Sequence, residues 1–142
     1  MPRRAASFVL LCALAAALLG CSSDKPPPAP TADSNAVPTR YKEEIIDTLK
    51  KLFDKNDTGS VTGAMLSDPA LEKVGGDQHY AACVRYTAHS TSDNMAANVE
   101  RIAYFYGGHL NQLVETAPGQ CRNAAYKPFP ELDQVCLGKG CK

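Results

Sequence analysis

Cys21 is the residue of this sequence that is best placed for chemistry. It ends the stretch LLGC, and its thiolate is a far better nucleophile at neutral pH than a serine hydroxyl. Upstream lie the basic pair Arg3 and Arg4 and an apolar stretch at residues 8–19, a pattern typical of an export signal. A transmembrane helix needs about 20 apolar residues to cross ~30 Å of hydrocarbon, and this stretch is shorter. We therefore expect residues 1–20 to be a cleaved signal peptide.

The LLGC stretch is similar to the lipobox of bacterial lipoproteins. That resemblance implies a diacylglyceryl thioether on Cys21, cleavage before it by the lipoprotein signal peptidase, and a further acyl chain on the new amine. Two or more acyl chains hold a protein stably at a bilayer. Ser22 follows the cysteine where an aspartate would imply retention, so the resemblance further implies the periplasmic leaflet of the outer membrane. The alternative is an ordinary secretory signal that leaves Cys21 as a free thiol.

The composition divides the rest of the chain into three parts. Residues 21–38 combine the predicted lipidated cysteine with a segment of five prolines, which predicts an extended tether of up to ~50 Å. Residues 39–133 are long enough for one domain with one core, and residues 134–142 end the chain. We therefore expect a single domain on a stiff tether, followed by a short tail closed by a disulfide.

Four cysteines remain beyond Cys21. An exported protein meets an oxidising compartment, so we expect disulfides, and four thiols allow three pairings. We favour Cys83 with Cys121, and Cys136 with Cys141, because the latter pair closes a short glycine-containing ring. The alternative is a zinc ion held by these cysteines with His79 or His109, although their spacing is not that of a zinc finger or ribbon.

The elements that must position these residues indicate an α+β fold. Apolar residues recur with helical period at residues 40–54, which predicts an amphipathic helix. Strand-forming residues predict a small antiparallel sheet of three to four strands that packs against this helix and a short C-terminal helix. The predicted strands are residues 60–66, 79–89, 99–106 and 109–115, and the predicted C-terminal helix is residues 119–126.

The clearest local signal is a hairpin that turns at Gly107 and Gly108. A two-residue turn would place Tyr106 opposite His109, Phe105 opposite Leu110, and Tyr104 opposite Asn111. We expect the helix to bury the Phe105 face and the tyrosines to stay partly exposed. Ile102 and Leu113 fall on the tyrosine face in this register, which suggests a bulge or a sheet covered on both sides. Tyr104, Tyr106 and His109 form a possible interaction surface, and the alternative is a solvated outer face.

Residues 54–65 resemble the calcium-binding loop of an EF-hand. Asp54, Asn56 and Thr58 occupy the first ligand positions, but Met65 replaces the glutamate that would supply two calcium oxygens. The alternative is a helix end followed by a turn and a strand. We expect no resident metal or cofactor, and calcium binding by this loop is the main exception to test.

Charge and motifs favour a non-catalytic role. Without Arg3 and Arg4, 13 basic residues face 15 acidic ones, a net charge of −2 with the amine acylated, so no basic nucleic-acid surface is expected. Neither a catalytic motif nor a metal-binding spacing of histidines is visible. We expect a structural or protein-interaction lipoprotein of the cell envelope, whose partner is another envelope protein or the cell wall. The alternatives are a ligand- or ion-binding module, a periplasmic inhibitor or, last, an anchored enzyme.

Overall fold

The structure of the protein is a computed structural model, which describes residues 35–56, 58–93 and 95–135. Cys21 and the predicted signal peptide at residues 1–20 lie outside these ranges. Most of the predicted tether and the predicted tail disulfide between Cys136 and Cys141 lie outside them as well.

The described chain forms an α+β fold around one antiparallel sheet. The sheet has six strands, so the prediction of three to four was too low. The two strands that were missed are short, and one of them contains a proline, which makes both weak sequence signals. In chain order the elements are α1 (Tyr41–Lys55), β1 (Thr58–Ser67), β2 (Ala70–Val74), β3 (Asp77–Ser90), β4 (Ala96–Tyr106), β5 (His109–Glu115), β6 (Tyr126–Pro128) and α2 (Pro130–Asp133).

Strand β3 is the centre of the sheet. The strand order is β5-β4-β3-β1-β6, and β2 also pairs with β3. β1 pairs with the second half of β3 and β2 with its first half, so β1 and β2 run in line along one edge of a single long strand. Asp68 and Pro69 separate the two, since proline cannot donate to a strand ladder. β3 thereby holds β1 and β2 in the same sheet.

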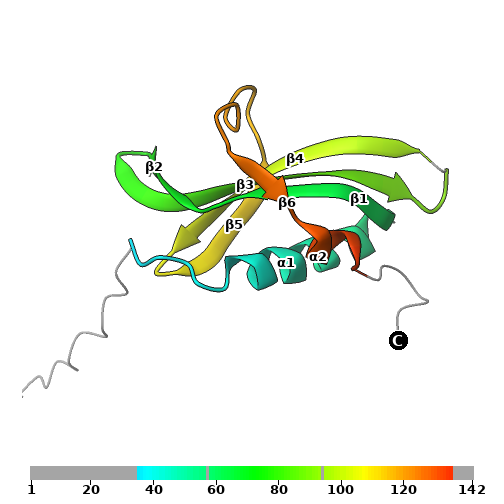
Figure 1. The fold of residues 1–142 in the computed structure, drawn as a ribbon, viewed down its shortest axis with the longest axis horizontal. Coiled ribbons are helices and arrows are strands. Elements are labelled where there is room, and N and C mark those ends of the chain that lie inside the picture. The colour runs from blue at the N-terminus through cyan, green and yellow to red at the C-terminus, as the bar shows by residue number, and fades with distance from the viewer. Residues whose placement is uncertain (1–34, 57, 94, 136–142) are drawn as a thin grey trace, which may run out of the picture.

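Helix α1 and helix α2 cover the same face of the sheet, which we call the inner face (Figure 1). α1 buries Ile45, Leu49 and Phe53, the apolar stripe that predicted this helix. The Phe53 ring meets the Tyr86 ring of β3 edge-on, with centroids 5.4 Å apart. Burial of one such aromatic or aliphatic side chain contributes about 1.5–3 kcal/mol. The inner face is therefore the main core of the domain.

The connection between β5 and β6 crosses the opposite face, which we call the outer face (Figure 1). The prediction of a helix at residues 119–126 was wrong, because residues 118–123 form consecutive turns. Gly119 has φ of 82°, which a helix does not accommodate, and a disulfide holds Cys121 against β3. A short C-terminal helix does exist, but it is α2, which begins with Pro130 in the first turn.

Candidate interaction surface

The disulfide between Cys83 and Cys121 divides the outer face. It joins β3 to the β5–β6 connection, with Cα atoms 6.0 Å apart, and confirms the predicted pairing of these two cysteines. Ala81, Ile102 and the two cysteines form a small buried cluster there. A hollow of about 380 Å³ lies between the connection and β2. Further hollows lie on the outer face to either side of the cluster.

The first of these, the Tyr106 groove, has a volume of about 210 Å³. Tyr104 and Tyr106 of β4 contribute its aromatic wall, as the prediction of partly exposed tyrosines requires, and 51% of Tyr106 is exposed. The His79 ring of β3 lies beside Tyr106, with ring centroids 5.9 Å apart. The groove is lined by Val74, His79, Tyr104, Phe105, Tyr106, Asn111 and Gln112.

A bulge in β5 supplies the two amides of this groove. Phe105 pairs with Leu110 and Tyr106 with His109, as predicted, but Tyr104 pairs with Gln112 rather than Asn111. Asn111 is the extra residue, and a bulge of this kind re-aims the side chains around it. Asn111 and Gln112 consequently both line the Tyr106 groove, although a regular strand would direct consecutive side chains to opposite faces. The predicted alternatives, a bulge or a sheet covered on both sides, are both found.

His109 does not join the tyrosines in the groove. Its Nδ1 lies 3.0 Å from Oε1 of Glu44, in the first turn of α1, and the Leu110 N–H donates to Oε2 of Glu44 at 2.6 Å. Burial opposes ionisation of Glu44, but the hydrogen bonds from His109 and Leu110 outweigh it and lower the pKa of the carboxyl. His109 thus links the hairpin to the helix, and this member of the predicted surface is placed elsewhere.

His79 and Val74, like the two amides from the β5 bulge, are members of the groove that sequence reasoning missed. Both come from the β2–β3 hairpin, and β2 was not predicted. His79 begins the predicted strand at residues 79–89, but its position beside Tyr106 depends on the register between β3 and β4. Those strands are joined by a longer loop at residues 91–95. Such a loop does not define the register as a two-residue turn does, so the sequence carried no clear signal.

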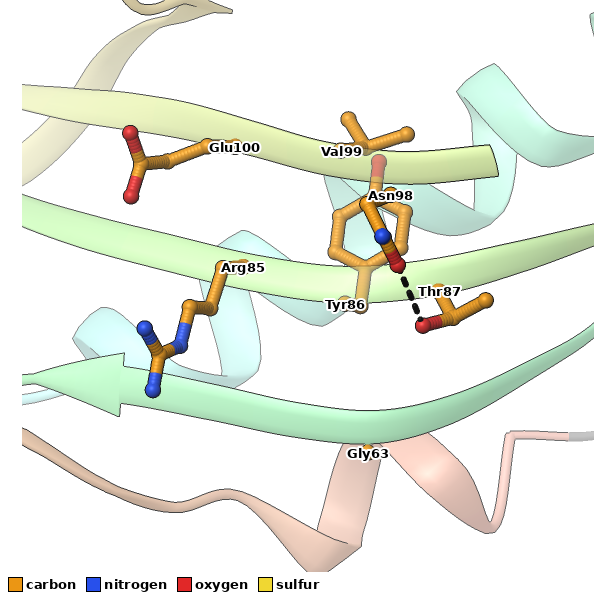
Figure 2. A pocket seen from close by; sticks show the side chains of 7 residues that line it. All are labelled: Gly63, Arg85, Tyr86, Thr87, Asn98, Val99 and Glu100. Atoms are coloured by element: carbon orange, nitrogen blue, oxygen red, sulfur yellow. Dashed lines mark hydrogen bonds between the residues drawn. The ribbon is translucent and has the colours of Figure 1, made fainter. Parts of the chain in front are cut away.

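The second hollow, the Arg85 hollow, lies on the other side of the disulfide and has a volume of about 360 Å³. Its lining residues come from β1, β3 and β4: Gly63, Arg85, Tyr86, Thr87, Asn98, Val99 and Glu100 (Figure 2). The Thr87 hydroxyl donates to the Asn98 side-chain oxygen at 2.9 Å. The guanidinium of Arg85 lies over the Tyr126 ring, 4.3 Å from its centroid. The polar groups of this hollow therefore already contact one another or the β6 strand.

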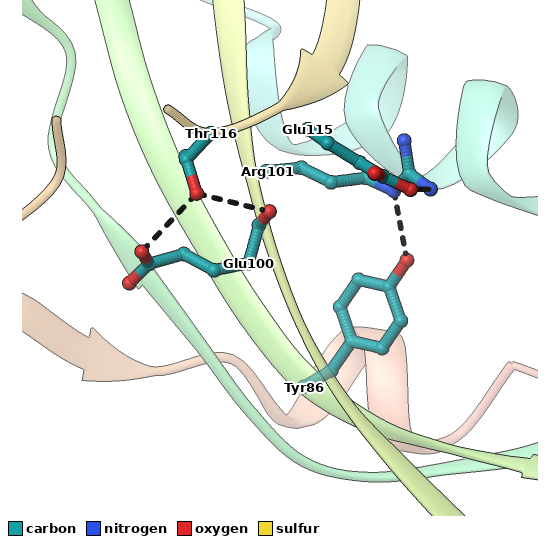
Figure 3. A network of polar contacts seen from close by, with 5 residues as sticks. All are labelled: Tyr86, Glu100, Arg101, Glu115 and Thr116. Carbon is teal, nitrogen blue, oxygen red and sulfur yellow. Dashed lines mark hydrogen bonds and ion pairs between the residues drawn. The ribbon is translucent and has the colours of Figure 1, made fainter. Parts of the chain in front are cut away.

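Glu100 is the most connected residue at the Arg85 hollow. Its carboxylate accepts from the Tyr126 hydroxyl at 2.7 Å and from the Thr116 hydroxyl at 3.3 Å, and the second contact is drawn in Figure 3. Burial and the hydrogen bond to Glu100 together raise the pKa of Tyr126. Both partners of Glu100 flank the β5–β6 connection, so the carboxylate helps to hold that connection on the sheet.

Arg101 forms a separate polar network on the inner face (Figure 3). Its Nε donates to the Tyr86 hydroxyl at 3.2 Å, and its guanidinium pairs with Glu115 of β5 at 3.2 Å. Burial raises the pKa of Tyr86 despite the neighbouring guanidinium. The hydrogen bond from Arg101 gives the buried Tyr86 side chain a partner for its hydroxyl, which is a structural role.

The two metal alternatives lose their basis in the described residues. Cys83 and Cys121 are joined in a disulfide and hold no free thiolate for zinc. The EF-hand-like stretch continues as β1 from Thr58, where Thr58 pairs with Ser90 and Thr62 with Thr87 of β3. An extended strand cannot wrap around a cation. In the described ranges, three or more potential metal ligands do not come together at any point.

Two further observations bear on function. Helices in the described part of the chain lack the length and apolar character needed to cross a membrane. No protein-family model, curated protein or solved structure matches the chain. The function must therefore be inferred from its own residues and geometry.

Proposed function

We propose that the chain is a lipid-anchored protein of the bacterial cell envelope, facing the periplasm, with a structural or interaction role rather than a catalytic one. The observation that carries this proposal is the LLGC stretch that ends at Cys21, behind a basic and apolar leader. The anchor would be acyl chains on Cys21, at the periplasmic leaflet of the outer membrane.

The Cys83–Cys121 disulfide supports the proposed compartment. Disulfides persist in oxidising environments such as the periplasm and are rare in the cytosol. This one lies in the buried cluster on the outer face, where both cysteines are 4% exposed. A disulfide that staples a loop onto the sheet is consistent with a small domain that works outside the cytoplasm.

The outer face supports an interaction role. The Tyr106 side chain is half exposed and Val74 is 37% exposed, at the mouth of a groove that also holds two amides. Exposed tyrosines beside polar groups are typical of recognition surfaces, because one side chain offers both apolar area and a hydrogen-bonding group. The partner proposed for this surface is another envelope component.

The anchor is tested by the Cys21→Ser variant, followed by intact-mass analysis and membrane fractionation. We expect the wild-type chain to gain the mass of its acyl groups and to sediment with membranes, and the variant to do neither. Cys12→Ser is the matched control, since Cys12 lies in the predicted signal peptide and its loss should change nothing. A Cys21→Ser chain that is processed and retained like the wild type would refute the anchor.

The proposed membrane is tested separately. A lipoprotein with Ser22 should sediment with the outer membrane on a density gradient, and Ser22→Asp should move it to the inner membrane. Wild-type protein found in the inner membrane would refute this part of the proposal while leaving the anchor intact.

A further inference from the structure

The Tyr106 groove leaves hydrogen-bonding groups unused in the described part of the chain. Nδ1 of His79 is buried there and has no hydrogen-bond partner among the described residues. The side-chain amides of Asn111 and Gln112 likewise make no hydrogen bond to a described residue. Buried polar groups in folded proteins normally have partners, so the unpaired Nδ1 of His79 indicates that a ligand or water supplies one. The amides of Asn111 and Gln112 are exposed, so water solvates them in the free protein and a ligand in the groove can exchange hydrogen bonds with them.

The lining restricts the chemistry of that ligand. None of the lining side chains is a lysine, arginine, aspartate or glutamate. A charged ligand would lose its hydration there without gaining a counter-charge, which is costly. The Tyr106 ring presents an exposed aromatic surface, while the amides each offer a donor and an acceptor. A suitable ligand is therefore neutral, with an apolar face and polar groups around its edge.

The size of the groove points to one ring rather than an extended chain. Its volume of about 210 Å³ corresponds to roughly seven water molecules at the liquid volume of about 30 Å³ each. A single pyranose ring is of this order of size. Its faces carry C–H groups that can pack on an aromatic ring, and its edge carries hydroxyls.

The geometry points to a neutral, N-acetylated sugar ring as the ligand of the Tyr106 groove. The pyranose face packs on Tyr106, and the acetamido group exchanges hydrogen bonds with the amides of Asn111 and Gln112. The source of this sugar rests on the proposed function, since an envelope protein meets such sugars in the glycan strands of the cell wall. The binding chemistry itself depends only on the groove.

The experiment is a titration of the full chain, purified in detergent, with the N-acetylglucosamine trimer, followed by saturation-transfer NMR and calorimetry. The expected Kd is on the order of 1 mM or tighter. Maltotriose, which lacks acetamido groups, should bind at least about tenfold more weakly.

Three variants locate the site. Tyr106→Ala should raise the Kd for the trimer about tenfold, because it removes the stacking surface. The double variant Asn111→Ala, Gln112→Ala should reduce the preference for the trimer over maltotriose. Arg85→Ala, in the neighbouring hollow, is the matched control and should bind the trimer like the wild type. Circular dichroism and thermal melting of each variant establish that it is folded.

Several results would overturn the inference. One is that no binding of the trimer is detected at a trimer concentration about tenfold above the expected Kd. Another is equal binding by the wild type and by folded Tyr106→Ala. A third is that an envelope protein binds the groove instead. Such a protein would bind the wild-type chain and not the Tyr106→Ala chain, and the trimer would not displace it. Acylation of Cys21 is measured independently, so failure of the sugar inference and failure of the proposed anchor are separate results.

Discussion

The Tyr106 groove and the Arg85 hollow lie on the same face of the sheet, on either side of one disulfide, yet their polar groups are used differently. Around the Arg85 hollow, Thr87 bonds to Asn98, and Glu100 accepts from Tyr126 and Thr116. In the Tyr106 groove, the side-chain amides of Asn111 and Gln112 make no hydrogen bond to a described residue. The hollow has the larger volume, and the groove has the greater unused capacity for hydrogen bonds. The larger volume therefore does not coincide with the larger number of side-chain amides that lack a described hydrogen-bond partner.

The largest expected effect comes from the disulfide that separates the two regions. The double variant Cys83→Ala, Cys121→Ala should lower the free energy of unfolding by about 4 kcal/mol, because the bond closes a loop across a sequence separation of 38. Urea denaturation of the full chain measures the change. Hydrogen exchange at Thr116 and Gln120 should also speed up, since the connection loses its covalent tie. A loss below about 1 kcal/mol would show that the hydrogen bonds alone hold the connection.

A second, smaller effect tests the separation of His109 from the groove. Glu44→Gln should destabilise the domain by about 2 kcal/mol at pH 7, because a carboxylate that accepts two hydrogen bonds is replaced by an amide. The pKa of Glu44 is lowered below 4.5 in the folded state, so its stabilisation is present above that value. It should disappear as the pH falls through the folded pKa. Urea midpoints at pH 7 and pH 3 measure the difference.

Glu43→Gln is the control for this change, because Glu43 is exposed on the same helical turn and makes no described side-chain hydrogen bond. It should shift neither midpoint measurably. If Glu44→Gln also left the pH 7 midpoint unchanged, the hydrogen bonds of the Glu44 carboxylate to His109 and Leu110 would have no role in stability.

Glu100→Ala tests whether the polar groups of the Arg85 hollow are committed to the fold. We expect a loss of about 1 kcal/mol, since the Tyr126 hydroxyl loses its acceptor at a site exposed to water, whereas the Thr116 hydroxyl keeps the backbone carbonyl oxygen at position 100. The phenol of Tyr126 should then titrate at a lower pH, because the carboxylate no longer raises its pKa. Glu115→Ala removes an ion pair whose carboxylate is 79% exposed, and it should cost less than about 0.5 kcal/mol because Arg101 keeps its hydrogen bond to Tyr86. Chemical denaturation and ultraviolet titration of tyrosine measure these changes.

The smallest expected effect on stability comes from the two amides of the Tyr106 groove. Asn111→Ala and Gln112→Ala together should change the free energy of unfolding by no more than about 0.5 kcal/mol, because neither amide bonds to a described residue. The measurement is the same urea titration. A loss above about 1 kcal/mol would mean that these amides do support the fold and are not available to a ligand.

Local sequence signals predicted the elements that are regular and missed those that depend on distant contacts. The periodicity of Ile45, Leu49 and Phe53 predicted α1, and the glycine pair predicted the β4–β5 hairpin. Each is decided by neighbouring residues. The turns at residues 118–123 depend instead on the bond between Cys121 and Cys83, and strand β6 exists through its pairing with β1.

The candidate surface divides in the same way. Tyr104 and Tyr106 were predicted because alternation within one strand places them on one face. His109 was assigned to that face by the same rule, but Glu44 of α1 draws it toward the helix. His79 reaches the groove through the register of β3 against β4, which no short-range pattern specifies. The alternation of side chains along a strand thus predicts which face of the sheet a residue occupies. Tertiary contacts decide which residues of that face share a site.

The pairing of β6 with β1 has a consequence for the order of folding. It joins Met65 to Pro128, whereas β3, β4 and β5 pair with strands that are close in the chain. Contacts between distant residues carry a larger entropic cost of loop closure and form late. A chain that emerges with its N-terminus first, as it does during synthesis, would therefore carry an unfinished edge at β1 until residues 126–128 emerge. During that interval, the exposed edge of β1 is open to pairing with a second molecule.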